Sequence, residues 1–352
     1  MSSIVNVTGA ERPGYVVVRT PLFHVRVNRR VVLQILVAVS LAGLAALWAL
    51  TQGSYDMSIA DAFRAVLGEG SADQVHVVRQ LRMPRIATGV LVGACLALSG
   101  ALFQGVVRNE LASPDIIGIN AGAGAIGFVW LLVTRNVVAL PWVLFLGAMG
   151  MASLIYVTSW KKGIDPNRLI LVGMGLQAML AAVETFMVRR FPVEDAIWAD
   201  SLLIGSVATA TWSDTRLLAI GLAVLVPCAM MVAWPLRGLQ LGDDTASSVG
   251  LRVELLRFVI IAIGCWLSAL AIAVAGLVGF VALMVPHIAR MIAGPVSAGV
   301  LVLTGVIGGV FVVVADTVGN NLLPVTLPVS IVMGVIGAPY FLFLFWRSRV
   351  RM

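Results

Sequence analysis

Few side chains in this sequence could carry chemistry, and they are scattered along the chain. Only three of the 352 residues are histidines, and His287 lies in an apolar stretch directly after Pro286. No HExxH pair or carboxylate at ligand spacing accompanies it, which favours a structural or pathway-lining role over a metal site. Glu184 and Asp316 lie near the predicted ends of apolar stretches, within reach of water. An ion-coupled carrier, although still an alternative, would be expected to bury more ionisable groups than these.

The sequence also lacks the motifs of a nucleophile or a nucleotide site. It contains no GxSxG elbow and no GxxxxGK[ST] loop, so any ATP that powers this protein is expected to be hydrolysed by a partner. Cys95, Cys228 and Cys265 lie in apolar stretches without a CxxC pair, and we expect them to be free. We therefore expect a non-enzyme, with no catalytic residue, no metal ligand and no cofactor bound by this chain.

The elements that must position these residues are membrane helices. Hydrophobic residues make up 60% of the chain, charged residues only 12%, and the mean hydropathy is +1.01. Such a chain has too little polar surface to coat a soluble globule, and a span needs about 20 apolar residues. The sequence predicts an all-α polytopic membrane protein with about ten transmembrane helices. The predicted spans are 31–51, 83–107, 116–134, 138–160, 167–188, 215–234, 256–276, 277–293, 296–317 and 326–346.

The eighth predicted span is expected to be short or broken, because glycines and prolines interrupt residues 276–295. An even number of spans places both termini on one side of the membrane. The formal net charge of +7 is spread over short loops and both chain ends, which indicates topology rather than nucleic-acid binding. Most basic residues fall inside the cell if both termini are cytoplasmic, whereas Arg82 and Arg85 fall outside, against this rule.

This topology divides the chain into a cytoplasmic extension, residues 1–30, and a transmembrane domain, residues 31–348. Outside the membrane, residues 58–67 predict a surface helix with Ser58 at its N-cap and Asp61 three residues later. Residues 196–207, too short to span, predict an interfacial or partly inserted helix.

The cytoplasmic segment 241–258 predicts two short helices in a turn, with Asp243 as an N-cap and Gly250 as a helix stop. Its apolar residues form a ridge that suits a groove on a soluble partner. An interfacial helix resting on lipid headgroups suits the same composition, so both interpretations stay open at this point.

Small residues recur at helical spacing in the second predicted span. Gly89, Gly93, Ala97 and Gly100 form a face that lets another helix approach closely, and we expect close packing there. Gln104 continues this face, and we favour an amide bridge to a neighbouring helix over a pathway-lining role.

Several blocks of residues together resemble one family. They are LRMPR at 81–85, GACLALSGALFQGVVRNELASPDIIGINAGA at 93–123, LGDDTASSVGL at 241–251, GFVALMVPHIAR at 279–290, VADT at 314–317 and LPVSIVMGVIGAPYFLFL at 327–344. In this order they resemble the FecCD-type permeases of ATP-binding-cassette (ABC) importers for iron-siderophores, haem and vitamin B12. The resemblance runs from about residue 30 to residue 348.

The resemblance implies the bundle of a type II ABC importer, similar to the vitamin B12 importer permease. Two permease subunits would surround a central pathway, two cytoplasmic ATPases would hold ATP and Mg, and an extracytoplasmic siderophore-binding protein would deliver the cargo. It also implies that coupling helices at about 241–256 contact the ATPase. The implied contact residues are Gly242, Asp243, Asp244, Ala246, Val249, Gly250 and Leu251.

By the same resemblance, Arg82 and Arg85 would dock the binding protein. The family usually has a basic residue after the VADT block and often an acidic one before LPV, where this sequence has Asn320 and Thr326. These departures favour a heterodimer slightly over a homodimer. We expect a ferric siderophore as cargo and an inner-membrane location, with cobalamin or haem as alternative cargoes and a secondary carrier or a receptor subunit as alternative functions.

Overall fold

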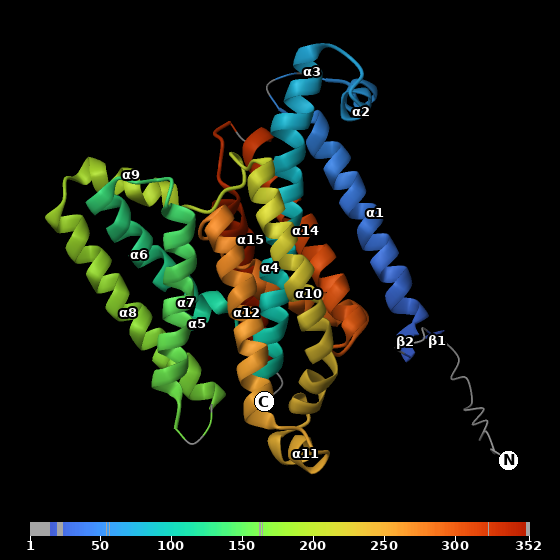
Figure 1. The fold of residues 1–352 in the computed structure, drawn as a ribbon, viewed down its shortest axis with the longest axis vertical. Coiled ribbons are helices and arrows are strands. Elements are labelled where there is room, and N and C mark those ends of the chain that lie inside the picture. Colours follow the sequence, from blue (N-terminus) through green and yellow to red (C-terminus); the bar gives the residue numbers. More distant parts are fainter. Residues whose placement is uncertain are drawn as a thin grey trace.

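The computed structural model describes residues 15–19, 24–53, 55, 57–161, 163, 165–322 and 324–349. The part described is a helical bundle preceded by a short hairpin (Figure 1). The hairpin pairs β1 (Tyr15–Arg19) with β2 (His24–Asn28) in antiparallel register, within the predicted extension. The remaining elements are α1 (Arg29–Thr51), α2 (Ile59–Leu67), α3 (Ala72–His76), the π-helical η1 (Val77–Arg82), α4 (Met83–Val107), α5 (Pro114–Ile117), α6 (Ile119–Thr134), α7 (Leu140–Ser159), α8 (Pro166–Arg190), α9 (Val193–Leu203), α10 (Trp212–Gln240), α11 (Asp243–Ser248), α12 (Val253–Ala275), α13 (Val281–Ala293), α14 (Ala298–Asn321) and α15 (Val329–Arg349).

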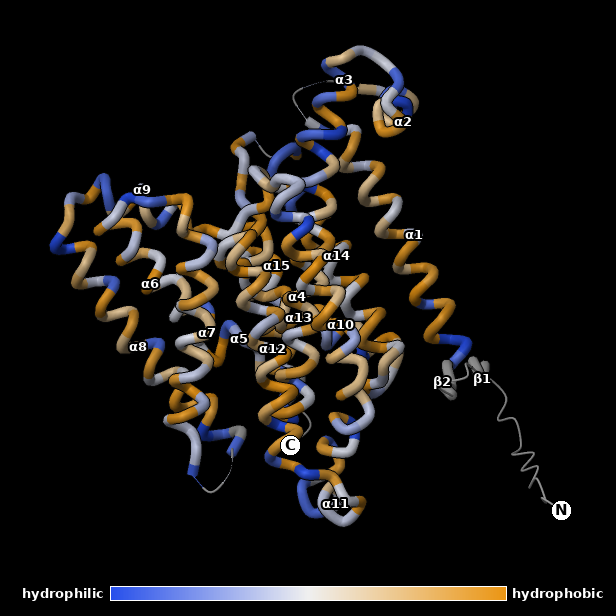
Figure 2. The backbone as a smooth tube through the Cα atoms, in the orientation of Figure 1, coloured by the Kyte–Doolittle hydropathy of each residue, from blue (hydrophilic) through white to orange (hydrophobic). Residues whose placement is uncertain are grey.

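The predicted membrane helices are confirmed. Seven helical stretches within the described residues are long and apolar enough to cross a bilayer, and the three shorter apolar helices α6, α13 and α15 make ten. Hydrophobic residues run along the helix bodies, and hydrophilic residues gather toward the two ends of the bundle (Figure 2). We call these the α2 end and the knob end, the latter carrying α11. The start of α1 and the end of α15 lie toward the knob end (Figure 1).

The centre of the bundle is α4, which continues without a break from α3 and η1 at the α2 end. Helices α10, α12, α13 and α14 pack around it. About 72% of the most apolar window in the α3–α4 stretch is buried, against 11% for α8, so one helix forms the core and the other leaves most of its surface uncovered.

The eighth span is short, as predicted, for a visible backbone reason. Phe280 has a left-handed φ of 65°, and Gly294 ends the 13-residue α13 with a φ of 87°. Before it, the chain is extended, with Leu277 paired to Ile204 in a short parallel bridge. The Phe280 N–H donates to Oδ2 of Asp115 at 3.1 Å, which satisfies a backbone group at the start of the broken helix.

Of two local predictions at the α2 end and near α9, one is confirmed and the other has different bounds in the structure. The N-cap of α2 is confirmed, because the Ser58 hydroxyl accepts from the Asp61 N–H at 3.1 Å. The helix expected at 196–207 instead occupies α9 and ends at Leu203. After it the chain becomes extended, because the Ser206 N–H donates to the carbonyl of Ala275 rather than continuing the helix.

The segment 241–258 also differs from its prediction. It contains one separate short helix, α11, while its second part is the beginning of α12. Asp243 is not the N-cap: Gly242 occupies that position with a φ of 112°, and Asp243 is the first helical residue. The Asp243 carboxylate turns to Arg257 instead of to its own backbone, so a tertiary ion pair replaces the local cap.

Candidate functional site

The residues predicted to couple to a partner lie together at one end of the molecule. We call residues 241–251 the knob; it projects beyond the ends of the long helices (Figure 1). Ala246 is fully buried and anchors the knob, and the Leu251 N–H donates to the Ala246 carbonyl at 3.0 Å. Leu241 and Val249, by contrast, are 71% and 62% exposed. The knob therefore combines a fixed base with an apolar outer surface.

Glycines at both sides of α11 give the knob its shape. Gly242 and Gly250 have φ values of 112° and 82°, in a region that residues with a Cβ rarely adopt. They turn the chain sharply on either side of α11, and Gly250 has open space around it. The two glycines thus close a compact turn whose outer face is unobstructed.

An ion cluster joins the base of the knob to two long helices. Nη2 of Arg257, in α12, lies 2.7 Å from both carboxylate oxygens of Asp243, and Arg257 is only 4% exposed. Glu254 adds a second carboxylate, with its Oε1 3.3 Å from Nη1 of Arg257. Arg108, directly after α4, places Nη2 3.4 Å from Oδ1 of Asp243. Asp243 therefore connects the knob to the end of α4 and to α12 through ion pairs.

The two arginines predicted to dock a binding protein both have partners at the α2 end. Arg82 is 8% exposed and donates to the carbonyls of Leu50 and Tyr55. Arg85 is more accessible and makes a two-point ion pair with Asp316 of α14, at 2.6 and 3.0 Å. Docking stays a prediction for both residues, and a partner would reach Arg85 more readily than Arg82.

The small-residue face of α4 lies in direct contact with two backbones. A Cβ added to Gly93 would lie 2.1 Å from the carbonyl oxygen of Gly308 in α14. One added to Gly100 would lie 1.8 Å from the carbonyl oxygen of Ala282 in α13. Gly89 faces side chains of α14 less tightly, and Ala97 is fully buried. Only a residue without a side chain fits at the two closest positions.

Gln104 lies on the same helix and bridges to α13 in the structure. Its Nε2 donates to the Leu283 carbonyl at 2.9 Å, and its Oε1 accepts from Nη2 of Arg290 at 2.7 Å. The amide is 3% exposed, so these bonds satisfy a polar group in the core.

Sequence reasoning missed the partners of these residues. The sequence indicated only a cytoplasmic location for Arg108, Arg257 and Arg290. No motif in the sequence marked Glu110. In the structure Oε2 of Glu110 lies 3.0 Å from Nδ1 of His287. None of these pairs has a sequence spacing that predicts it, except for Glu254 and Arg257, which lie three residues apart on one helix.

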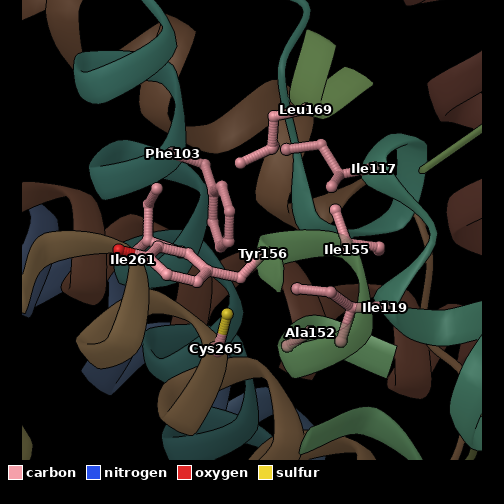
Figure 3. Close-up of a pocket in the computed structure, with 9 residues that line it drawn as sticks. All are labelled: Phe103, Ile117, Ile119, Ala152, Ile155, Tyr156, Leu169, Ile261 and Cys265. Atoms are coloured by element: carbon pink, nitrogen blue, oxygen red, sulfur yellow. The ribbon is translucent and has the colours of Figure 1, made fainter. Parts of the chain in front are cut away.

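A small internal cavity does not provide a binding site. Apolar residues from α4, α5, α6, α7, α8 and α12 line it, together with the thiol of Cys265 and the ring of Tyr156 (Figure 3). It contains no charged side chain to orient a ligand. Among the described residues, no group of three potential metal-ligating side chains is found. The main features of the site are therefore a continuous central helix and a projecting knob. An ion pair between Arg108 and Asp243 connects the knob to the end of that helix.

The chain is similar to known proteins. The chain matches the FecCD transport family over residues 25–347. It is 34% identical to the ferric enterobactin transport system permease protein FepG of Escherichia coli (strain K12), over 78% of this chain and 83% of that protein. It is 37% identical to the achromobactin transport system permease protein CbrC of Dickeya dadantii (strain 3937), over 70% of this chain and 72% of that protein.

A solved structure supports the same assignment. It is described as an inward-facing conformation of a metal-chelate type ABC transporter. It matches with a TM-score of 0.80 and 28% identity, over 89% of this chain and 98% of that chain. Sequence family, relatives and fold agree, and the chain therefore belongs to the FecCD transport family, as a permease subunit of an ABC importer.

Proposed function

We propose that this chain is one of two permease subunits in an inner-membrane importer of ferric siderophores, driven by ATPase subunits that seat against the knob. Relatives named for ferric enterobactin and achromobactin transport support this cargo class. The observation that carries the proposal is the knob itself. Its exposed Leu241 and Val249 have no partner in the described part of the chain, whereas its base is buried and ion-paired.

In this proposal the knob end faces the cytoplasm. The start of α1 and the end of α15 lie toward the same end, and charge distribution in the sequence favours cytoplasmic termini. ATP and Mg belong to the partner ATPases, and this chain contributes no catalytic residue. Closure of the ATPases would push the knob and tilt the helices attached to it, a rigid-body form of alternating access.

A second permease subunit would complete the transport path. Helix α8 is the least covered of the long spans, and Gln177 in its middle is exposed. An amide in contact with lipid tails is unfavourable, so water or a second subunit suits this face better. Asn320 donates to Asp316 in α14, at the position where a basic residue is usual in the family. The absence of this basic residue favours a heterodimer, because a non-identical permease subunit could supply the charge.

The siderophore-binding protein would dock at the α2 end. Arg85 is the better candidate contact there, since 24% of its side chain is exposed. A carboxylate on the binding protein would have to share this guanidinium with Asp316. Such a pair at the rim steers association more than it adds affinity.

A substitution at the knob surface tests the ATPase contact. Val249→Arg places a charge on the exposed face without touching an internal contact, and we expect iron uptake to fall at least about tenfold, the change that 1.4 kcal/mol of lost contact produces. The measurement is uptake by proteoliposomes that contain the purified importer with its own ATPases and binding protein. The matched control is Val193→Arg on α9, 65% exposed at the opposite end of the bundle. Normal uptake by Val249→Arg would refute the knob contact.

The cargo is tested with labelled ferric catecholate, ferric hydroxamate, ferric citrate and cobalamin. A cobalamin import permease of Halobacterium salinarum is among the relatives, which justifies the last probe. We expect uptake of a ferric siderophore that stops when ATP is depleted while a proton gradient remains. Uptake that survives ATP depletion would instead indicate an ion-coupled carrier, and uptake of cobalamin alone would overturn the cargo.

A further inference from the structure

The loop that follows α4 contacts two separate moving parts. Residues 108–112, which we call the exit loop, connect α4 to the short helix α5. At its first residue the loop reaches the knob, and two residues later it reaches α13. We propose that the exit loop transmits the movement of the knob to α13, with Arg108 and Glu110 as positioning residues. This proposal rests on the proposed contact between the knob and an ATPase.

The first contact is electrostatic and connects the loop to the knob. Arg108 places Nη2 3.4 Å from Oδ1 of Asp243, the residue that also binds Arg257. A carboxylate held by two guanidinium groups moves with both of them. Displacement of the knob therefore pulls on the start of the exit loop as well as on α12.

The second contact connects the loop to α13. Oε2 of Glu110 lies 3.0 Å from Nδ1 of His287, whose side chain is 11% exposed. A carboxylate at this distance attracts the charged imidazolium, and it also attracts the N–H dipole of the neutral tautomer that carries hydrogen on Nδ1, so the contact does not need a charged histidine. The His287 ring also packs edge-to-face against Tyr340 of α15, with ring centroids 6.1 Å apart.

The exit loop is short and internally bonded. Arg108 has a left-handed φ of 56°, which turns the chain sharply at the end of α4. The side-chain Oδ1 of Asn109 accepts from the Leu111 N–H at 2.9 Å, and the backbone carbonyl of Asn109 accepts from the Ala112 N–H at 3.1 Å. A loop of this kind transmits a displacement instead of absorbing it.

The receiving helix is a separate backbone segment. Left-handed Phe280 and positive-φ Gly294 interrupt the backbone on both sides of α13, so its 13 residues are not continuous with α12 or α14. The contact with Glu110 acts near the middle of this segment. A pull through the exit loop would therefore tilt α13 without bending a long span.

Distance measurements on the assembled importer test the proposal. Spin labels are placed at Ser248 on the knob and at Met291 on α13, each paired with a reference label at Thr158 on α7. All three positions are exposed. The partly exposed Cys228 is replaced by alanine, whereas Cys95 and Cys265 are buried. Electron–electron distances are recorded in lipid nanodiscs without nucleotide and with MgATP and vanadate.

We expect both distances to change with nucleotide in the otherwise unmodified protein. In Arg108→Gln and in Glu110→Ala the knob distance should still change, whereas the α13 distance should lose most of its shift. Uptake per ATP should fall about 2- to 5-fold, as expected for the loss of one part-exposed ion pair. Arg108→Lys, which keeps the charge, should restore the α13 shift.

Arg135→Gln provides the control, because it breaks an exposed ion pair with Asp195 that lies away from the knob. It should leave both distance changes intact. If α13 shifts normally in Arg108→Gln and Glu110→Ala, the transmission proposal is wrong although the ATPase contact can still hold. If the knob distance itself does not respond to nucleotide, the proposed contact with the ATPase fails, and the transmission fails with it.

Discussion

At the α2 end of α4, Arg85 donates two hydrogen bonds to Asp316, at 2.6 and 3.0 Å. The Asp316 side chain is only 8% exposed. At the knob end, Arg108 reaches Asp243 at 3.4 Å, and the two side chains are 36% and 43% exposed. Both are arginine–aspartate pairs at the ends of one helix. The first is short and protected from water, whereas the second is longer and open to it.

This difference assigns different mechanical properties to the two ends. A protected two-point ion pair holds α4 to α14 in one arrangement, because breaking it strands a charge out of water. A part-exposed pair is worth at most about 1 kcal/mol, so Arg108 holds the knob to the end of α4 less strongly than Arg85 holds α14 to its start. We therefore expect the α2 end to serve as a fixed frame and, under the proposed function, the knob end to move against it.

The largest effect on stability is expected from disrupting the packing of α4, the helix that connects the two ends. Gly93→Leu would place a side chain where the Gly308 carbonyl already lies, with the Cβ 2.1 Å from its oxygen. We expect a loss of stability beyond the about 1–3 kcal/mol typical of overpacking, with little folded protein recovered. Yield and melting temperature in detergent measure it. Gly150→Leu on α7, where nothing lies within 4 Å, should have little effect.

A substitution at the fixed frame should have the next largest effect. Asp316→Asn removes the charge that Arg85 holds, and we expect a loss of about 2–3 kcal/mol, less than for a fully buried pair because Arg85 keeps some contact with water. Chemical denaturation in detergent micelles measures the free energy of unfolding. Uptake per folded molecule should change little. A strong loss of uptake without a loss of stability would contradict the role of this end as a frame.

The corresponding substitution at the moving end should show the opposite pattern. Asp243→Asn weakens the contacts with Arg257 and Arg108, but Glu254 still pairs with Arg257. We expect a stability loss of about 1 kcal/mol, since the Asp243 side chain is 43% exposed. Iron uptake per ATP hydrolysed should fall by more than this small loss explains. Equal losses of stability and of uptake in the two aspartate variants would remove the contrast between the ends.

The smallest effect is expected at a pair that belongs to neither end of α4. Arg135 and Asp195 are 2.6 Å apart, but the Arg135 side chain is 66% exposed. Asp195→Asn should change stability by no more than about 0.5 kcal/mol, because water and salt screen such a pair. Denaturation at low and at high salt checks this. A loss as large as that of Asp316→Asn would show that exposure does not separate these pairs.

Features that depend on neighbours in the sequence were predictable. The span predicted at 83–107 ends where α4 ends and lies within one helical stretch that begins at Ala72, because a long apolar stretch in a membrane can satisfy its backbone only as a helix. Ser58 caps α2 because its hydroxyl needs only the N–H three residues later. The stop at Gly250 follows equally from a backbone angle that glycine tolerates.

Features that depend on distant residues were not. The sequence suggested a local cap for Asp243, but Arg257, fourteen residues away, binds this carboxylate from α12. Arg82 appeared free for a partner protein, yet Leu50 and Tyr55 supply its acceptors from an adjoining segment. The pairing of Arg85 with Asp316 spans 231 residues. No local pattern carries this information.

The sequence by itself determined that this protein is a bundle of membrane helices and where its spans lie. Hydropathy and backbone propensity act over one or a few helical turns, so the order of the residues records them directly. Only the tertiary structure decided which charges are already paired and which surfaces stay open, because packing the helices together brings acids and arginines from distant spans within bonding distance. The contrast between a protected ion pair at one end of α4 and a more exposed one at the other follows from that packing.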